Sequence, residues 1–299
     1  MLGPVKNFKH SLYQGWKNRR HLMDVSLACL SDVRRYQYSP EKYRRKIGEV
    51  VVPRVSTFNI NHLDFPVSGS PSDIELEAPH KIFVCWTGDN EMGDSRRESL
   101  QRIIEDNPEF EVIVVTADNY RDFEVPEHPL HPAYEKLSYV HRSDYLRSYL
   151  MYHYGGVYTD IKMLSKPWNS IVSRLNQSDA WAAGPGEMCS ANVSPAWGKL
   201  GLHQRLYWQQ VLWPAAFAFK PGTPLAKEWL EEVERRLDYF SRLLFAHESQ
   251  DPVWGLDEGY PVPWNAIMGQ IFSPLCLKYH DKLLIDNEIK FVMNSAGYR

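Results

Sequence analysis

The chain has 299 residues, of which 43% are hydrophobic and 24% are charged, and its net charge is −3. These values are typical of a soluble globular protein with one large or two small domains, and they exclude nucleic acid as an expected partner. The four cysteines lie far apart without a CxxC pair, which makes a zinc site unlikely on spacing alone and favours a reducing compartment. No apolar run is long enough to cross a bilayer and no signal peptide is recognisable, so we expect a cytoplasmic protein without its own membrane anchor.

Positive charge is concentrated in the first 50 residues, which hold eleven Lys and Arg against four Asp and Glu. Their balance of +7 leaves −10 for the remainder of the chain. We expect two or three helices over residues 5–48, because apolar residues recur there at roughly helical spacing. Two interpretations of the basic residues stay open. They form a solvated helical face, or residues 1–50 make a peripheral contact with anionic lipid headgroups or a charged glycan.

The domain organisation that we expect has three parts. Residues 1–52 form a basic helical region, and residues 53–79, rich in Pro, Gly and Ser, form a connector. Residues 80–299 form an α/β domain. It opens with an apolar run at Lys81–Trp86, an amphipathic helix at Arg96–Asn107 and a second apolar run at Phe110–Ala117. This order is typical of a βαβ unit and predicts a parallel sheet.

Ligands of such sheets bind beyond the carboxyl ends of the strands, which makes Trp86 and Thr87 candidate site residues. The next helix is predicted to start near Ser138 and to run up to two glycines. Asp144 and Arg147, three residues apart, then project from one face of it.

The two glycines separate this helix from a strand. Gly155 suits the left-handed residue that ends a helix, and Gly156 allows a sharp turn. The alternation over Val157–Leu164 predicts a strand with Tyr158, Asp160, Lys162 and Leu164 on one face. A carboxylate inside an apolar strand costs free energy unless it is paired, so we expect Asp160 at a strand end facing a cleft. Beyond it the sequence predicts a strand at 181–186, a strand at 215–219, a helix at 224–242, a helix at 265–277 interrupted by Pro274, and a last strand within 283–292.

Two motifs in this chain resemble a known family. The combination S-D-x-x-R and G-G-x-Y-x-D (Ser143, Asp144, Arg147, Gly155, Gly156, Tyr158 and Asp160) is similar to the signature of DXD-type sugar transferases. The family with this signature is glycosyltransferase family 32, which includes initiating mannosyltransferases and capsular-polysaccharide transferases. The clostridial glucosylating toxins are more distant members. The segment K-I-x-x-x-W-x-G-x-N-x-M, from Lys81 to Met92, resembles the opening strand of the same family. The resemblance covers about residues 79–170, weakens up to about residue 240 and does not include the first 78 residues.

The resemblance implies a GT-A fold, a mostly parallel, Rossmann-like α/β arrangement that binds nucleotide-diphospho-sugars. It implies that Trp86 stacks on the nucleotide base, that Asp144 contacts the ribose or the donor sugar, and that Arg147 reaches the diphosphate or the donor sugar. Tyr158 would flank the nucleotide. Thr87, Gly155 and Gly156 are further candidates for the nucleotide-sugar site.

One residue departs from the family pattern. Family members hold Mn²⁺ or Mg²⁺ with two carboxylates that are two residues apart. Here Asp160 is the first carboxylate, and Lys162 stands where the second is expected. Three explanations stay open. In the first, Asp160 binds the metal together with a remote carboxylate, such as Asp257, Glu258 or Asp251. In the second, Lys162 donates to a phosphate and replaces part of the metal's charge. In the third, the site is retired and binds a sugar nucleotide without turnover. We favour the first, with Lys162 able to act beside the metal.

The function that this resemblance implies is a retaining glycosyltransferase with Asp160, Arg147 and Lys162 as its catalytic residues. It would move a hexose or N-acetylhexosamine from a UDP- or GDP-sugar to a glycan acceptor, either a surface polysaccharide or a lipid-linked oligosaccharide. Two alternatives stay open: a catalytically retired module that binds sugar nucleotides or glycans, and an effector that glycosylates a host protein.

Overall fold

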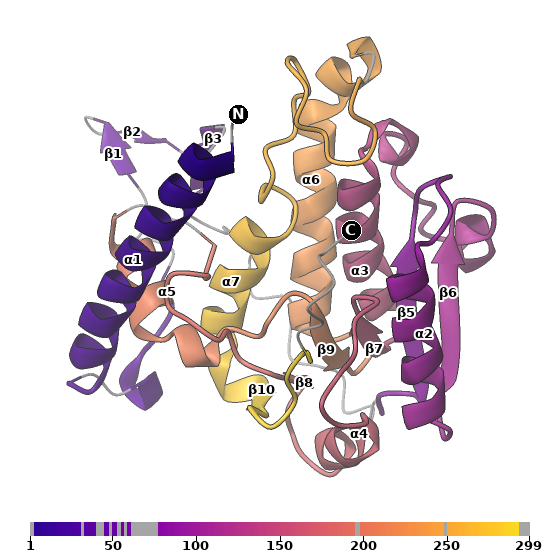
Figure 1. Cartoon of the computed structure of the whole chain (residues 1–299), viewed down its shortest axis with the longest axis horizontal. Helices are drawn as coiled ribbons and strands as arrows, with labels where there is room; N and C mark the ends of the chain where they lie inside the picture. The colour runs from indigo at the N-terminus through magenta and orange to yellow at the C-terminus, as the bar shows by residue number, and fades with distance from the viewer. Residues whose placement is uncertain are drawn as a thin grey trace.

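A computed structural model describes residues 3–30, 33–39, 45–47, 50–52, 55–56, 59–60, 77–194, 198–247 and 250–292 of the chain. Its centre is a six-stranded sheet with the strand order β10-β8-β9-β7-β5-β6 (Figure 1). The strands are β5 (Lys81–Trp86), β6 (Glu111–Thr116), β7 (Gly156–Thr159), β8 (Ala182–Gly184), β9 (Ala216–Phe219) and β10 (Leu283–Ile285). Only β9 runs against its neighbours, so the sheet is mostly parallel, as the sequence predicts.

The predicted βαβ unit is confirmed. Strands β5 and β6 pair in parallel along their whole length, and helix α2 (Asp94–Asp106) connects them. The apolar run of β5 forms a strand because Ile82, Phe83 and Val84 are buried, and burial of such side chains drives folding. Strand β7 pairs with the other edge of β5, also in parallel. The carboxyl ends of β5 and β7 are therefore neighbours.

Helix α3 (Tyr139–His153) begins and ends as predicted. Ser138 caps it, since its Oγ accepts a hydrogen bond from the backbone N–H of His141 at 3.4 Å. Gly155, with a φ of 63°, follows the helix in the left-handed region, and its N–H donates to the carbonyl of Leu150. Gly156 also has a positive φ of 87° and starts β7. The two glycines thus turn the chain from α3 directly into β7.

Strand β7 is shorter than predicted, which corrects the expected strand over 157–164. It ends at Thr159 because the chain turns there: the N–H of Lys162 donates to the carbonyl of Asp160 at 2.7 Å. The N–H of Asp160 still donates to the carbonyl of Ala215 at 2.8 Å, which holds the first residue of the turn against the start of β9. Asp160 and Lys162 therefore lie in a loop just beyond the carboxyl end of β7.

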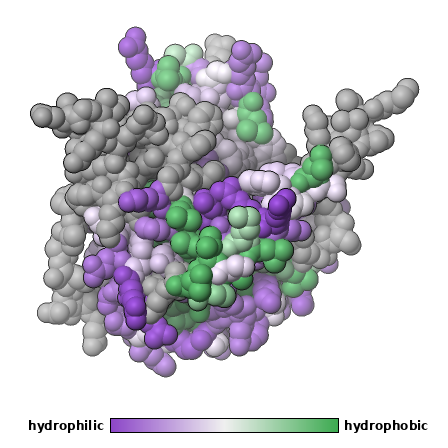
Figure 2. Space-filling view, turned by 90° about the vertical axis from the view of Figure 1, so that its left-hand side faces the viewer, coloured by the Kyte–Doolittle hydropathy of each residue, from purple (hydrophilic) through white to green (hydrophobic). Residues whose placement is uncertain are grey.

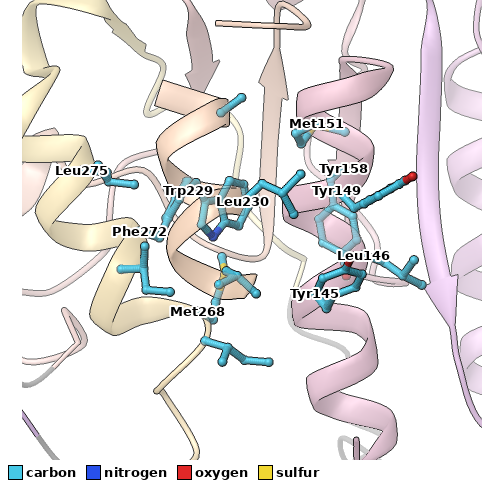
Figure 3. Close-up of a cluster of buried hydrophobic side chains, with 14 of the residues drawn as sticks. Tyr145, Leu146, Tyr149, Met151, Tyr158, Trp229, Leu230, Met268, Phe272 and Leu275 are labelled. Carbon is cyan, nitrogen blue, oxygen red and sulfur yellow. The ribbon is translucent and has the colours of Figure 1, made fainter. Parts of the chain in front are cut away.

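Helices cover both faces of the sheet. Helices α3, α6 (Pro224–Ala246) and α7 (Gly269–Lys278) pack on one face. Helices α2 and α4 (Asn169–Asn176) pack on the other. In Figure 3 the side chain of Trp229 on α6 lies between α7 and α3, and its ring centroid is 4.6 Å from that of Phe272. Burial on both faces explains why the strands read as apolar runs rather than as alternating patterns.

The helices and strands that the sequence predicts after β8 are present, but their lengths do not always agree with the prediction. Thr223 caps α6 with Pro224 at its first position, as that sequence favours. Pro274 lies inside α7 without ending it, so the predicted interruption is wrong. The last strand, β10, ends at Ile285, and only an isolated bridge joins Leu164 to Phe291.

The described residues of the N-terminal region differ from the expected two or three helices. They form one long helix, α1 (Gly3–Ala28), and a short 3₁₀ turn at Val33–Arg35. Strands β1 (Arg45–Ile47) and β2 (Val50–Val52) form a small antiparallel pair, as do β3 (Val55–Ser56) and β4 (Asn59–Ile60). Helix α1 packs beside α5 (Gly198–Leu206) on the left of Figure 1. Most of the predicted connector, residues 61–76, lies outside the described residues. Of the helices that the structure describes, none combines the length and the apolar character of a membrane span.

Candidate active site

A cluster of polar side chains lies at the carboxyl end of β7. Helix α3 supplies Asp144 and Arg147, β7 supplies Tyr158, and the loop after β7 supplies Asp160 and Lys162. The two-glycine turn between α3 and β7 makes these elements antiparallel neighbours, so residues that are 13 positions apart in the chain meet in space. This edge of the sheet is where ligands of parallel α/β folds bind.

The guanidinium of Arg147 lies at the centre of the cluster. Its Nη1 is 3.4 Å from Oδ1 of Asp144 and donates to the carbonyl of Pro214 at 3.1 Å. Its Nη2 donates to Oδ1 of Asp160 at 3.3 Å. Its buried Nε has no hydrogen-bond partner in the described part of the chain. Burial lowers the pKa of Arg147, but the neighbouring anionic groups raise it by more, so this group stays charged.

Tyr158 and Ser143 also contact the guanidinium of Arg147. The guanidinium lies over the Tyr158 ring at 4.6 Å from its centroid, which is a cation–π contact. Ser143 Oγ accepts from Arg147 Nη2 at 3.3 Å and lies 3.2 Å from the Tyr158 hydroxyl. The arginine is therefore held in one orientation before any ligand arrives.

Both carboxylate oxygens of Asp160 are engaged. Oδ1 accepts from Arg147 and, at 3.1 Å, from the Tyr158 hydroxyl, while Oδ2 accepts from Lys162 Nζ at 2.9 Å. Burial alone would raise the pKa of Asp160, but the two cations lower it by more, so its pKa lies below the ordinary value. Asp160 is therefore ionised at neutral pH.

Asp144 has the opposite character. Burial raises its pKa to about 6, and the nearby Arg147 offsets only part of that effect. It is ionised at neutral pH but takes up a proton in mildly acidic solution.

Lys162 is held from two sides. Its ammonium pairs with Asp160 and lies over the Phe291 ring at 4.7 Å from the centroid. Phe291 in turn packs on Trp213, with ring centroids 4.2 Å apart. A lysine fixed in this way presents its charge at a defined place within the cluster.

Trp86 and Thr87 lie at the carboxyl end of the neighbouring strand β5. The indole N–H of Trp86 donates to the carbonyl of Asn90 at 2.7 Å, and Thr87 Oγ1 donates to the carbonyl of Tyr139 at 2.6 Å. These bonds tie the loop after β5 to itself and to the start of α3. Trp86 remains partly exposed, whereas Thr87 is buried.

Gly155 and Gly156 lie at the amino end of β7, on the opposite edge of the sheet from Asp160. A Cβ at Gly156 would lie 2.8 Å from the carbonyl oxygen of Lys81, so this position packs against backbone. Their expected contact with the nucleotide stays a prediction. They serve to connect α3 to β7.

The candidate second metal ligand, Asp257, is engaged through one oxygen only, because its buried Oδ1 has no hydrogen-bond partner among the described residues. Its Oδ2 lies 2.8 Å from Nε2 of His247 and accepts from the backbone N–H of Gln250 at 3.1 Å. Across the described ranges, no three His, Cys, Asp or Glu side chains come together as a metal site requires. A divalent cation at Asp160 would also have to displace Lys162. The donor set does not fit a site of the D-x-D kind.

Sequence reasoning missed several contributors to the cluster. Ser143 stood inside the quoted motif, directly before Asp144, but we gave it no role. The carbonyl of Pro214 and the ring of Phe291 had no signal in the sequence, because both reach the cluster only through tertiary packing.

Comparison with known proteins bears on this same segment. Residues 93–178 match a family model described as a glycosyltransferase sugar-binding region containing a DXD motif. The match extends from the start of α2 to just beyond α4 and includes every member of the cluster from Asp144 to Lys162. A search of curated proteins found no match. The matched segment and the mostly parallel α/β sheet together support the broad family of DXD-containing glycosyltransferases, with a GT-A-like nucleotide-sugar transferase fold.

Proposed function

We propose that this protein is a retaining glycosyltransferase that transfers a hexose or N-acetylhexosamine from a UDP- or GDP-sugar to a glycan acceptor. A surface polysaccharide or a lipid-linked oligosaccharide is the acceptor that we favour. The observation that carries the proposal is the buried Arg147, held between Asp144 and Asp160 within the segment that matches the sugar-binding region. An arginine fixed at the carboxyl edge of a parallel sheet suits a diphosphate, because its planar fork matches phosphate oxygens.

The reaction needs positive charge at the leaving group. As the bond between the sugar C1 and the diphosphate oxygen breaks, its electron pair passes to that oxygen. The acceptor hydroxyl oxygen bonds to C1 on the same face, and its proton passes to the leaving diphosphate. Fixed donors that face this developing charge lower the barrier without a protein nucleophile.

Arg147 and Lys162 supply that charge in our proposal. The unpaired Nε of Arg147 is a donor that the described protein groups leave unused. Asp144, ionised at neutral pH, would accept hydrogen bonds from ribose or sugar hydroxyls. Trp86, partly exposed at the end of β5, would stack on the base.

Lys162 takes the place of the metal in this proposal. The sequence alone favoured a metal held by Asp160 and a remote carboxylate, but Asp257 bonds to His247 and Lys162 occupies Oδ2 of Asp160. Asp160 then orients Lys162 and Arg147 rather than a metal ion. Donor turnover should persist in EDTA, and a strict requirement for Mn²⁺ would contradict this part of the proposal.

The test is release of nucleotide from a panel of UDP- and GDP-sugars, with and without candidate acceptor glycans. We expect slow hydrolysis of one donor by the wild type and its loss in Asp160→Asn. A matched control is Asp179→Asn, because Asp179 is exposed, pairs with Lys282 and precedes the amino end of β8, whereas the cluster lies at the carboxyl end of β7. Failure of every donor to bind or react would contradict the proposed function.

A second candidate is a retired module that binds sugar nucleotides without turnover. One observation favours it: the protein itself neutralises both oxygens of Asp160, through Arg147 and Lys162. Lys162→Asp restores a carboxylate pair and distinguishes the two. Mn²⁺-dependent turnover that appears in the variant and is absent from the wild type would establish the retired site.

A further inference from the structure

Helix α1 turns its polar side toward the protein. Asp24 accepts from Ser190 Oγ at 2.8 Å, His21 lies 3.3 Å from the same hydroxyl, and Lys17 donates to Asn192 at 3.0 Å. Lys17, His21 and Asp24 follow one another at helical spacing and so share one face. That face is the one that packs on the body of the protein.

The opposite face of α1 is apolar and exposed. The side chains that form its stripe keep large exposed fractions: Leu12 58%, Trp16 52%, Met23 62% and Leu27 48%. They recur at positions i, i+4, i+11 and i+15, which places them along one side of the helix. Figure 2 looks at the side of the molecule where α1 lies and shows apolar residues gathered in one patch with hydrophilic residues around it. A surface helix ordinarily has the reverse arrangement, so this stripe is suited to contact an apolar phase or partner.

The charge on α1 is almost all positive. The helix carries five basic residues, Lys6, Lys9, Lys17, Arg19 and Arg20, and its one acidic residue, Asp24, is buried. The guanidinium of Arg20 lies over the Trp16 ring at 5.0 Å from its centroid, directly beside the stripe. A second copy of this helix would bring like charges together, which disfavours self-association. An anionic surface would satisfy both the charge and the apolar side chains.

We propose that α1 lies in the plane of an anionic lipid membrane. The stripe of Leu12, Trp16, Met23 and Leu27 would enter the boundary between headgroups and acyl chains, where aromatic and aliphatic side chains are favourable. Arg19 and Arg20 would reach the lipid phosphates from the margin of the stripe. This inference does not depend on the transferase activity, although it would hold the catalytic domain beside lipid-linked acceptors.

The test is sedimentation of the full-length protein with vesicles of phosphatidylcholine alone and of phosphatidylcholine mixed with phosphatidylserine. We expect binding to the anionic vesicles, weakened by high salt because ions screen the contacts. Arg19→Gln with Arg20→Gln should weaken it about 25-fold, at about fivefold for each charge. Trp16→Ser with Met23→Gln and Leu27→Gln should weaken it at least about tenfold.

The matched control is Leu243→Gln with Phe245→Gln, two similarly exposed apolar residues on α6. It should bind vesicles as the wild type does. Unchanged thermal unfolding and donor turnover of the α1 variants would show that they fold. Absence of wild-type binding to anionic vesicles, or equal binding by the α1 variants, would overturn the proposal. A dimer in sedimentation velocity that the stripe variants abolish would also overturn it, because the face would then be a contact between copies.

Discussion

Lys162→Gln is the substitution that most sharply tests how the site handles charge. The wild-type ammonium lies 2.9 Å from Oδ2 of Asp160 and is mostly shielded from solvent. Removing a fixed donor that faces developing negative charge costs about 10²–10³ in kcat, or about 2.7–4 kcal/mol of transition-state stabilisation. The fold should survive, because Asp160 keeps its bonds to Arg147 and Tyr158. Loss of one charged hydrogen bond costs about 1.5–3 kcal/mol, less than the stability of an ordinary domain.

The assay is nucleotide release from the preferred donor in EDTA, with urea unfolding measured on the same samples. Lys166→Gln is the matched control, since Lys166 is an exposed lysine four residues away that pairs with Glu288. It should keep wild-type turnover. Lys162→Asp should be inactive in EDTA and should gain activity with Mn²⁺. Equal turnover by Lys162→Gln and the wild type would refute the role of this lysine, as would wild-type activity that disappears in EDTA and returns with Mn²⁺.

Three further predictions concern the core, the turn before β7 and Asp144. Trp229→Ala should lower the free energy of unfolding by about 3–5 kcal/mol in urea titrations, because a fully buried aromatic side chain leaves a cavity; a loss below about 1 kcal/mol would contradict this. Gly155→Ala should lower the free energy of unfolding by at least about 1–2 kcal/mol, since φ is 63° and the new Cβ would lie 2.8 Å from the Pro221 nitrogen. The control is Gly93→Ala, because the space around Gly93 is open. Equal effects of the two substitutions on stability would refute the reasoning. Donor affinity should fall as pH drops through about 6, because the raised pKa of Asp144 lets it protonate there, and calorimetric titrations that give the same affinity on both sides of that pH would exclude the role. The same raised pKa means that the folded state binds this proton more tightly than the unfolded state does, so Asp144 makes the protein more stable as pH falls from about 6 towards 4.

The sequence predicts much of the sheet because the relevant signals are local. An apolar run predicts β5, and helical spacing of apolar residues predicts α2. Ser138 and Gly155 mark the start and the end of α3 through hydrogen bonds to nearby residues. These features depend on short-range sterics and on burial, and both can be predicted from the spacing of apolar residues. The end of β7 at Thr159 is not local in this sense. It depends on the loop after Asp160 and on the segment before β9, so alternation alone predicts too long a strand.

The candidate site could be predicted only in part. The spacing of Asp144 and Arg147 and the short path to Asp160 place these three residues near one another. The cluster is completed by Lys162, whose ammonium lies over the ring of Phe291. Phe291 is 129 positions further along the chain, so nothing in the sequence indicates this contact. The turn before β7 accounts for Gly155 and Gly156 in the motif through their positive φ, and their contact with a ligand stays a prediction.

The most direct measurement of the central claim is calorimetric titration of UDP and GDP into the wild type and into Arg147→Gln, both in EDTA. We predict that the wild type binds one of the two nucleotides without metal and that the variant binds it at least about tenfold more weakly, because a charge-assisted contact with the diphosphate is lost. Loss of the buried charge that pairs with Asp144 and Asp160 should lower the free energy of unfolding by about 3–5 kcal/mol. Asp160 keeps its bonds to Tyr158 and Lys162, so we expect the variant to fold, and urea unfolding curves check this. Absence of binding by the wild type, or equal binding by the two proteins, would contradict the claim that this cluster holds the donor's diphosphate.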